Sequence, residues 1–256
     1  MSYTTPIVTG GGPSQQSIHE TATTPRHIVG TRGVLSDGRV FYYSCNRTNA
    51  ILAAGKLTKM NEVSVDFDDL ATNTAAVGDM SVEVTPVGTA TYAANELAGG
   101  YLSINSSTAG GGVGHQYRIA RHAATTAATA FTLYLSEPIR VAFNADATAT
   151  VVPNPWSDCV ITDADETQFV NGCAPLAVPV GSDSAPIYFW NQTWGVATVL
   201  GNGTPAIGQA VQVSATTGGA FDALTEGAGT ANQPIGTILY TSVSADYTPV
   251  FLTIAP

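Results

Sequence analysis

Short apolar runs separated by Gly-, Thr- and Pro-rich connectors recur along most of the chain, with almost no helical spacing of apolar residues. The clearest pattern is in residues 28–45, where two runs rich in β-branched and aromatic residues flank Asp37-Gly38. Such runs favour strands, and Asp-Gly favours the positive φ values of a tight primed turn. Residues 28–45 therefore predict a β-hairpin.

The same criteria predict a series of further strands. They are 63–67, 80–86, 101–104, 115–119, 131–135, 139–143, 170–180, 187–200, 208–214, 235–240 and 250–254. One short helix is expected around residues 50–54, with Gly55 at its end. Many short strands without long helices are typical of antiparallel sheets closed into barrels or sandwiches. The predicted fold class is all-β.

Residues 1–25 differ from the rest, because prolines and a Gly10-Gly11-Gly12 run interrupt them and no periodicity is long enough to pack alone. We expect an extended N-terminal arm that orders on contact with a neighbouring subunit; a frayed terminus without a role is the alternative. The candidate subunit-contact residues in the arm are Tyr3, Pro6, Ile7 and Val8.

A domain boundary is expected at Pro153-Asn-Pro155-Trp, because two prolines exclude a central strand there. The predicted organisation is therefore an arm of residues 1–25, an antiparallel β module of residues 26–155, and a β-barrel-like or sandwich-like module of residues 156–256.

Composition narrows the function classes. Charged residues are 11% of the chain, against roughly 25% in typical soluble domains. The polar surface must then consist mainly of Thr, Ser, Asn and Gln, which lose water at lower cost than full charges. Nine basic against 19 acidic residues give a net charge of −10, so neither nucleic acid nor an anionic membrane surface is an expected partner.

Targeting and redox signals are few. The first ten residues lack the basic and apolar regions of a secretory signal, and no apolar run approaches the length that spans a bilayer. We expect a soluble protein that is made in the cytoplasm. Cys45, Cys159 and Cys173 show no CxxC spacing, so buried free thiols are expected, without a disulfide framework or a zinc site.

Candidate chemistry is sparse. His115 and His122 lie seven residues apart on a strand-like segment, hence on opposite faces. The acidic groups at 66–69 and 163–166 lack the register of a calcium loop and indicate solvated turns. The Gly-rich run 110–114 is not followed by Lys-Ser/Thr. We therefore predict no enzyme activity, no catalytic or metal-binding residues, and no cofactor.

The most distinctive segment is aromatic: Tyr188-Phe-Trp-Asn-Gln-Thr-Trp194. Tyr188, Trp190 and Trp194 could fill a core or a subunit interface, where aromatic rings dominate the burial energy. The alternative is a carbohydrate- or host-binding platform on which sugar rings stack. The absence of a second exposed aromatic run favours the core or interface.

Several short sequence segments between residues 27 and 254 resemble segments of a known class of proteins. They are His27-Ile-Val-Gly-Thr-Arg, Asp37-Gly-Arg-Val-Phe-Tyr-Tyr, Leu52-Ala-Ala-Gly-Lys-Leu57, Gly99-Gly-Tyr-Leu-Ser-Ile-Asn, Val152-Pro-Asn-Pro-Trp, Tyr188-Phe-Trp-Asn-Gln-Thr-Trp-Gly and Ile235-Gly-Thr-Ile-Leu. In these segments the chain resembles structural proteins of tailed bacteriophages, in particular capsid decoration (cement) proteins.

The resemblance implies a non-enzymatic virion component on the capsid exterior, synthesised in the host cytoplasm. It implies two partners: the major capsid protein and further copies of the chain, as a homotrimer. It transfers no functional residue, because it includes no defined active site.

Overall fold

The computed structural model describes residues 4–8, 12–48, 50–61, 65–108, 111–165, 167–225, 232–241 and 243–256. The chain divides into two compact units: unit 1 is Met1–Asn61 with Pro155–Pro256, and unit 2 is Glu62–Asn154. Over the described ranges the regular structure is β-strand apart from one 3-10 turn. The predicted all-β class is confirmed.

Unit 1 is built on one twelve-stranded antiparallel sheet. Its main path runs β16-β15-β17-β18-β14-β4-β3-β1-β2, and β5, β12 and β13 pair beside it. The strands are β1 Ile7–Val8, β2 Gly12–Pro13, β3 Arg32–Val34, β4 Val40–Asn46, β5 Leu57–Met60, β12 Cys159–Ile161, β13 Val170–Cys173, β14 Ile187–Leu200, β15 Ala210–Val213, β16 Phe221–Ala223, β17 Gly236–Ile238 and β18 Tyr247–Thr253.

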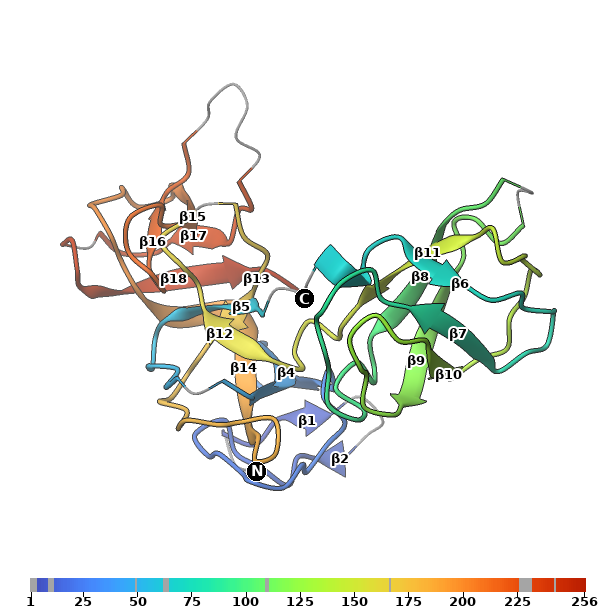
Figure 1. The fold of residues 1–256 in the computed structure, drawn as a ribbon. Helices are drawn as coiled ribbons and strands as arrows, with labels where there is room; N and C mark the ends of the chain where they lie inside the picture. The colour runs from blue at the N-terminus through green and yellow to red at the C-terminus, as the bar shows by residue number, and fades with distance from the viewer. Residues whose placement is uncertain are drawn as a thin grey trace. The chain divides into compact units, whose positions relative to one another are not determined.

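The long strand β14 joins the two chain segments of unit 1. Its first half pairs with β4, from Ile187↔Asn46 onward, and its second half pairs with β18, from Trp194↔Thr253 to Leu200↔Tyr247. A bulge between Gln192 and Trp194 separates the halves. The blue strand β4 and the red strand β18 in Figure 1, from opposite ends of the chain, are thereby linked in one sheet.

Unit 2 is a closed antiparallel barrel in the order β10-β7-β6-β11-β8-β9. Its elements are the 3-10 turn Val65–Phe67, β6 Leu70–Thr72, β7 Ser81–Thr85, β8 Tyr101–Ser106, β9 Gln116–His122, β10 Phe131–Leu135 and β11 Thr148–Val152. Alternate residues point inward, as in Phe131 and Leu133, and form a core that also includes Phe67, Tyr117 and Phe143. Closure leaves the barrel without an open sheet edge.

The units do not follow the two consecutive modules predicted from the sequence. The boundary at Asn154/Pro155 falls where the prolines indicate it, but residues 26–61 belong with 156–256 rather than with 62–154. The barrel is thus inserted between two segments of one sheet. The reason is the long-range pairing of β4 with β14, which no local pattern in either strand indicates.

The described part of residues 1–25 is not a detached arm. β1 pairs with β2 and β3, and Ile18 is fully buried. The Gln16 side chain accepts a hydrogen bond from the Tyr43 hydroxyl at 2.8 Å, and the Gln16 carbonyl accepts one from the Trp190 indole N–H at 3.0 Å. The segment therefore covers an aromatic cluster of its own unit.

Two local predictions are refined. The hairpin forms, but of its two turn residues only Gly38 has positive φ. The Gly38 N–H donates to the Leu35 carbonyl, so the connection is a longer turn with a glycine bulge rather than a primed two-residue turn. The helix expected at 50–54 is wrong, because Leu52 makes an isolated antiparallel bridge with Val178.

Ile18→Ala tests whether the N-terminal segment is part of the fold. Removing this fully buried side chain leaves a cavity, so we expect unit 1 to lose about 2–5 kcal/mol of unfolding free energy, measured by urea denaturation. The matched control is Ile28→Ala, where the side chain is 75% exposed and the expected change is within about 0.5 kcal/mol. Equal losses of unfolding free energy for both substitutions would indicate that residues 1–25 are an arm that does not contribute to the fold.

A buried histidine gives unit 2 a pH-dependent stability. His122 Nε2 accepts from the Leu97 backbone N–H at 2.9 Å, and Nδ1 donates to the Ala123 carbonyl at 2.6 Å. Both bonds suit the neutral ring, and burial lowers the pKa of His122. The pKa of His122 is therefore lower in the folded chain than in the unfolded chain. As pH falls, the unfolded chain binds the proton first, which favours unfolding. The contribution of His122 to stability is full above its unfolded pKa and is lost as pH drops through its folded pKa.

We therefore expect unit 2 of the unmodified chain to be less stable at about pH 5 than at about pH 7. His122→Gln offers an oxygen that can accept from Leu97 N–H but does not titrate, so its stability should decline less over this range. Urea denaturation at several pH values measures both. The pKa of His27 is also lowered by burial, and this residue stays in both proteins as an internal control. If the unfolding free energies of the unmodified chain and of His122→Gln depend on pH in the same way, His122 is not the cause of the pH dependence.

Candidate interaction surface

The outward face of β14, β18 and β17 in unit 1 is uncharged. Opposed residues of an antiparallel pair share a face, so the register Val196↔Phe251↔Thr237 places these side chains in one row. Thr198↔Pro249 and Leu200↔Tyr247 continue the rows along β14 and β18. The members of this outer face are Trp194, Val196, Thr198, Leu200, Thr237, Leu239, Tyr247, Pro249, Phe251 and Thr253.

Large apolar side chains on the outer face are solvent-exposed: Val196 and Tyr247 by 49%, and Leu239 by 42%. The inward residues of the same strands, such as Ala197, Val250 and Leu252, pack in a buried core cluster. The sheet therefore has one apolar face inside the unit and a second, partly apolar face in water. An exposed apolar face on a rigid sheet marks an interaction site.

A bulge and a glycine shape one end of the outer face. Gly195 has φ +86°, and a Cβ at this position would lie 3.0 Å from Arg39 Cγ, so only glycine lets Arg39 approach the strand. A shallow groove of about 500 Å³ follows, lined by Asp37, Gly38, Arg39, Trp194, Gly195, Val196 and Phe251. A second groove, of about 620 Å³, shares Arg39 and Val196 with the first and extends to Tyr247 and His19.

The charges beside the grooves neutralise each other. Arg39 Nε donates to Asp37 Oδ2 at 2.8 Å, and the Arg39 backbone N–H donates to Asp37 Oδ1 at 3.1 Å. Burial alone would raise the pKa of Asp37, but these hydrogen bonds and the guanidinium charge outweigh it and lower the pKa. The rim of the outer face is thus an ion pair, whereas its centre is apolar.

The structure separates the contact residues predicted in the N-terminal segment. Pro6 is buried, Val8 is half-buried, and Ile7 is 53% exposed. Tyr3 lies outside the described residues. Of these four residues, Ile7 alone is described with a largely exposed side chain, so it is the one available for contact with another subunit.

The aromatic residues of β14 have two different environments. Trp190 is fully buried and Tyr188 is 9% exposed, both in a cluster with Ile18, Phe41 and Tyr43. Tyr43 stacks against Tyr188 with ring centroids 5.9 Å apart, and burial raises the pKa of Tyr43 to about 12. Trp194 is half-buried, edge-on to Phe251 in the outer face. The three rings therefore do not form one exposed stacking platform.

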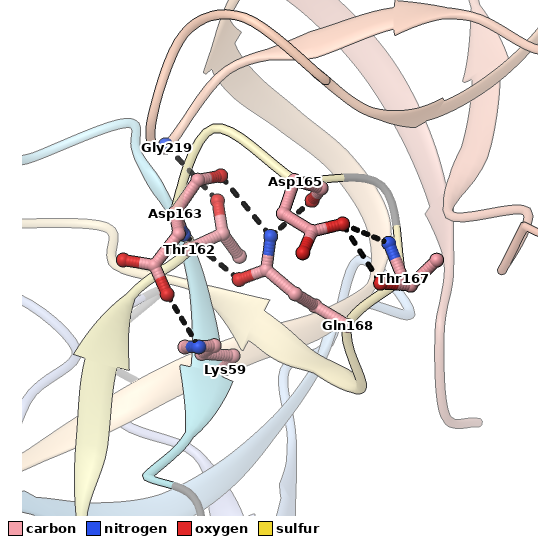
Figure 2. Close-up of polar contacts among 7 residues, drawn as sticks. All are labelled: Lys59, Thr162, Asp163, Asp165, Thr167, Gln168 and Gly219. Carbon is pink, nitrogen blue, oxygen red and sulfur yellow. Dashed lines mark hydrogen bonds and ion pairs between the residues drawn. The ribbon is translucent and has the colours of Figure 1, made fainter.

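The second acidic group noted in the sequence is held in place by hydrogen bonds through Asp163 and Asp165. In Figure 2, Lys59 Nζ donates to Asp163 Oδ2 at 2.6 Å, and Thr167 donates twice to Asp165 Oδ1 at 2.8 Å. The Thr167 backbone hydrogen bond is the main cause that lowers the pKa of Asp165. The Gln168 amide binds the backbone of Asp163 and Asp165. Figure 2 thus shows an acidic turn that is tied to Lys59 of β5 and to Gly219 as well as to its own residues.

The three cysteine thiols lie in the protein interior. Cys45, Cys159 and Cys173 are free and buried, as predicted. Burial raises the pKa of Cys45 to about 11 and that of Cys173 to about 12, so both are protonated at neutral pH. Among the described residues, no group of three or more His, Cys, Asp or Glu is arranged to hold a metal ion.

Sequence reasoning missed the outer face, although one signal for it was present. The outward positions of 196–200 and 247–253 are Val, Thr, Leu, Tyr, Pro and Phe, where a solvent-facing strand usually alternates with Lys or Glu. The register between β14, β18 and β17 is needed to show that these positions adjoin.

Comparisons with known proteins do not add to this geometry: no protein-family model, curated protein or solved structure matches the chain. No helix in the described part of the chain is long and apolar enough to cross a membrane.

Alanine substitution should separate the two tryptophan environments. Trp190→Ala removes a fully buried ring and its hydrogen bond to Gln16, so we expect a loss of about 3–5 kcal/mol of unit 1 stability. Trp194→Ala truncates a half-buried ring and should cost about 1–2 kcal/mol. Denaturant unfolding followed by circular dichroism measures both losses. A larger loss for Trp194 than for Trp190 would contradict the assignment of core and surface.

Proposed function

We propose that this chain is a structural virion protein that decorates and stabilises the exterior of a tailed-phage capsid by bridging capsid subunits. The observation that carries the proposal is the outer face of β14, β18 and β17, whose exposed positions are apolar or Thr. The choice of a phage capsid among possible assemblies rests on the sequence segments that resemble decoration proteins.

The energetics of the outer face favour a protein partner. Val196, Leu239 and Tyr247 gain roughly 25 cal/mol for each Å² of apolar surface that a partner covers. The Thr residues between them can hydrogen-bond across the interface without the desolvation cost of a full charge. Because the strands already hold this surface rigid, little conformational entropy is lost on binding.

Charge supports an exterior location. A net charge of −10 disfavours contact with packaged DNA, whereas an exterior position does not require basic residues. The proposed partners are the major capsid protein and further copies of the chain in a homotrimer, assembled after synthesis in the host cytoplasm. Many copies, each bound weakly, would stabilise a shell through avidity.

A carbohydrate-binding module is not proposed. That alternative depended on Tyr188, Trp190 and Trp194 presenting their rings together, and two of the three rings lie in the core of unit 1. A buried ring cannot stack against a sugar without unfolding its cluster.

Val196→Asp tests the proposal directly, with the substitution made in the phage that encodes the chain. A carboxylate in the centre of a covered apolar interface is costly to desolvate, so we expect at least about a tenfold loss of chain copies per purified virion. Quantitative mass spectrometry of gradient-purified particles measures the copy number, and thermal melting of the purified variant checks that it folds.

The matched control is Val180→Asp, because Val180 is also 49% exposed in unit 1 but is not a member of the outer face. This variant should be incorporated like the unmodified chain. Virions that contain no copy of the unmodified chain, or full incorporation of a folded Val196→Asp variant, would refute the proposal.

A further inference from the structure

The outer wall of the barrel in unit 2 carries two arginines beside two tyrosines. The register pairs Arg118 on β9 with Tyr101 on β8, and Arg121 on β9 with Tyr134 on β10. The guanidinium carbon of Arg121 lies 3.7 Å from the centroid of the Tyr134 ring. Both arginines are exposed, and the tyrosines are 36% and 37% exposed. These four residues are called the Arg/Tyr face.

The Arg/Tyr face has the composition of a binding hot spot. Arg and Tyr are enriched among the residues that dominate interface energies. Stacking on Tyr134 restricts the Arg121 guanidinium before any partner arrives, so less side-chain entropy is lost on binding. Within the described residues, no ion pair joins Arg118 or Arg121 to a carboxylate. The face therefore fits an acidic partner.

A second surface of the same barrel, over β6, β11 and β8, is acidic. Asp68 and Asp69 are exposed immediately before β6. Oδ1 of Asp68 accepts from the Thr150 hydroxyl, and Oδ1 of Asp69 accepts from Asn105 at 3.1 Å and Thr148 at 3.2 Å. These bonds hold both carboxylates in place. The two residues are called the acidic edge.

We propose that unit 2 associates head to tail with a second copy of this chain, with the Arg/Tyr face of one copy bound to the acidic edge of the next. The two surfaces differ in charge, so a contact between two copies uses the Arg/Tyr face of one and the acidic edge of the other. Such a heterologous contact closes into a ring or continues as an open chain, depending on its rotation.

Charge argues for a second copy over nucleic acid as the occupant. Residues 62–154 contain three arginines and no lysine, which are too few cations to neutralise a run of phosphates. A copy of the same unit presents two fixed carboxylates to two exposed guanidiniums. The inference rests on the proposed function only for the expectation that several copies of the chain come together on one capsid. Its two surfaces lie in unit 2, whereas the proposed attachment face lies in unit 1.

Sedimentation velocity of the purified full-length chain tests the inference, over a concentration series at low and high salt. We expect self-association that weakens with salt, because exposed ion pairs are screened. Arg118→Glu with Arg121→Glu, and separately Asp68→Lys with Asp69→Lys, should each raise the dissociation constant about a hundredfold or more, because like charges then face each other. The chain with all four reversals should associate again.

Two controls keep the outcome readable. Arg140→Glu changes the remaining arginine of unit 2, which pairs with Glu137 at 3.4 Å, and should leave association unchanged. Arg118→Gln with Arg121→Gln removes charge without adding it and replaces the reversal if a reversed variant fails to fold.

Three results would overturn the inference. The unmodified chain could be monomeric at all concentrations, or the arginine variants could associate like the unmodified chain. In the third result, the arginine variants lose binding to a DNA oligonucleotide but keep self-association. Val196→Asp should self-associate normally, so failure of capsid attachment and failure of head-to-tail association give different results.

Discussion

The antiparallel pairing of β14 with β4 on one half and β18 on the other is the interaction on which unit 1 depends. It brings residues 40–46, 187–200 and 247–253 into one sheet, and thereby leaves 62–154 to fold as a closed barrel within an insertion. A bulge in the pairing with β4 lies between Gln192 and Trp194, where the pairing with β18 begins on the other edge of β14. A single strand thus sets both the core packing and the position of the outer face.

The two halves of β14 are covered differently, and this difference produces the candidate surface. Around Trp190, the N-terminal segment covers the aromatic cluster through Ile18 and the Gln16 hydrogen bonds. Around Val196, no described segment covers the sheet, and the side chain is 49% exposed. Side chains of similar apolar character are therefore core in one half and surface in the other. The proposed capsid attachment assigns a partner to the second half.

Local chemistry in the sequence predicted much of the fold. Alternation and β-branched residues gave β14 its observed bounds, and Gly38 and the prolines at 153–155 marked a turn and a boundary. What could not be predicted depends on pairing between distant residues. Residues 1–25 have no periodicity of their own, and their packing could not be predicted because two of their partners, Tyr188 and Trp190, are far along the chain. The outer face likewise exists only once Val196, Phe251 and Thr237 are in register.

Hydroxyl-radical footprinting, which labels exposed tyrosine and phenylalanine rings, tests the central claim most directly when free protein is compared with purified virions. Tyr247 lies in the outer face and is 49% exposed, while Phe169 is 55% exposed in the same unit and serves as the reference. The account predicts that Tyr247 is labelled in the free chain and protected in the particle, with Phe169 labelled in both. Equal labelling of Tyr247 in both states would contradict an outer face that is covered on assembly.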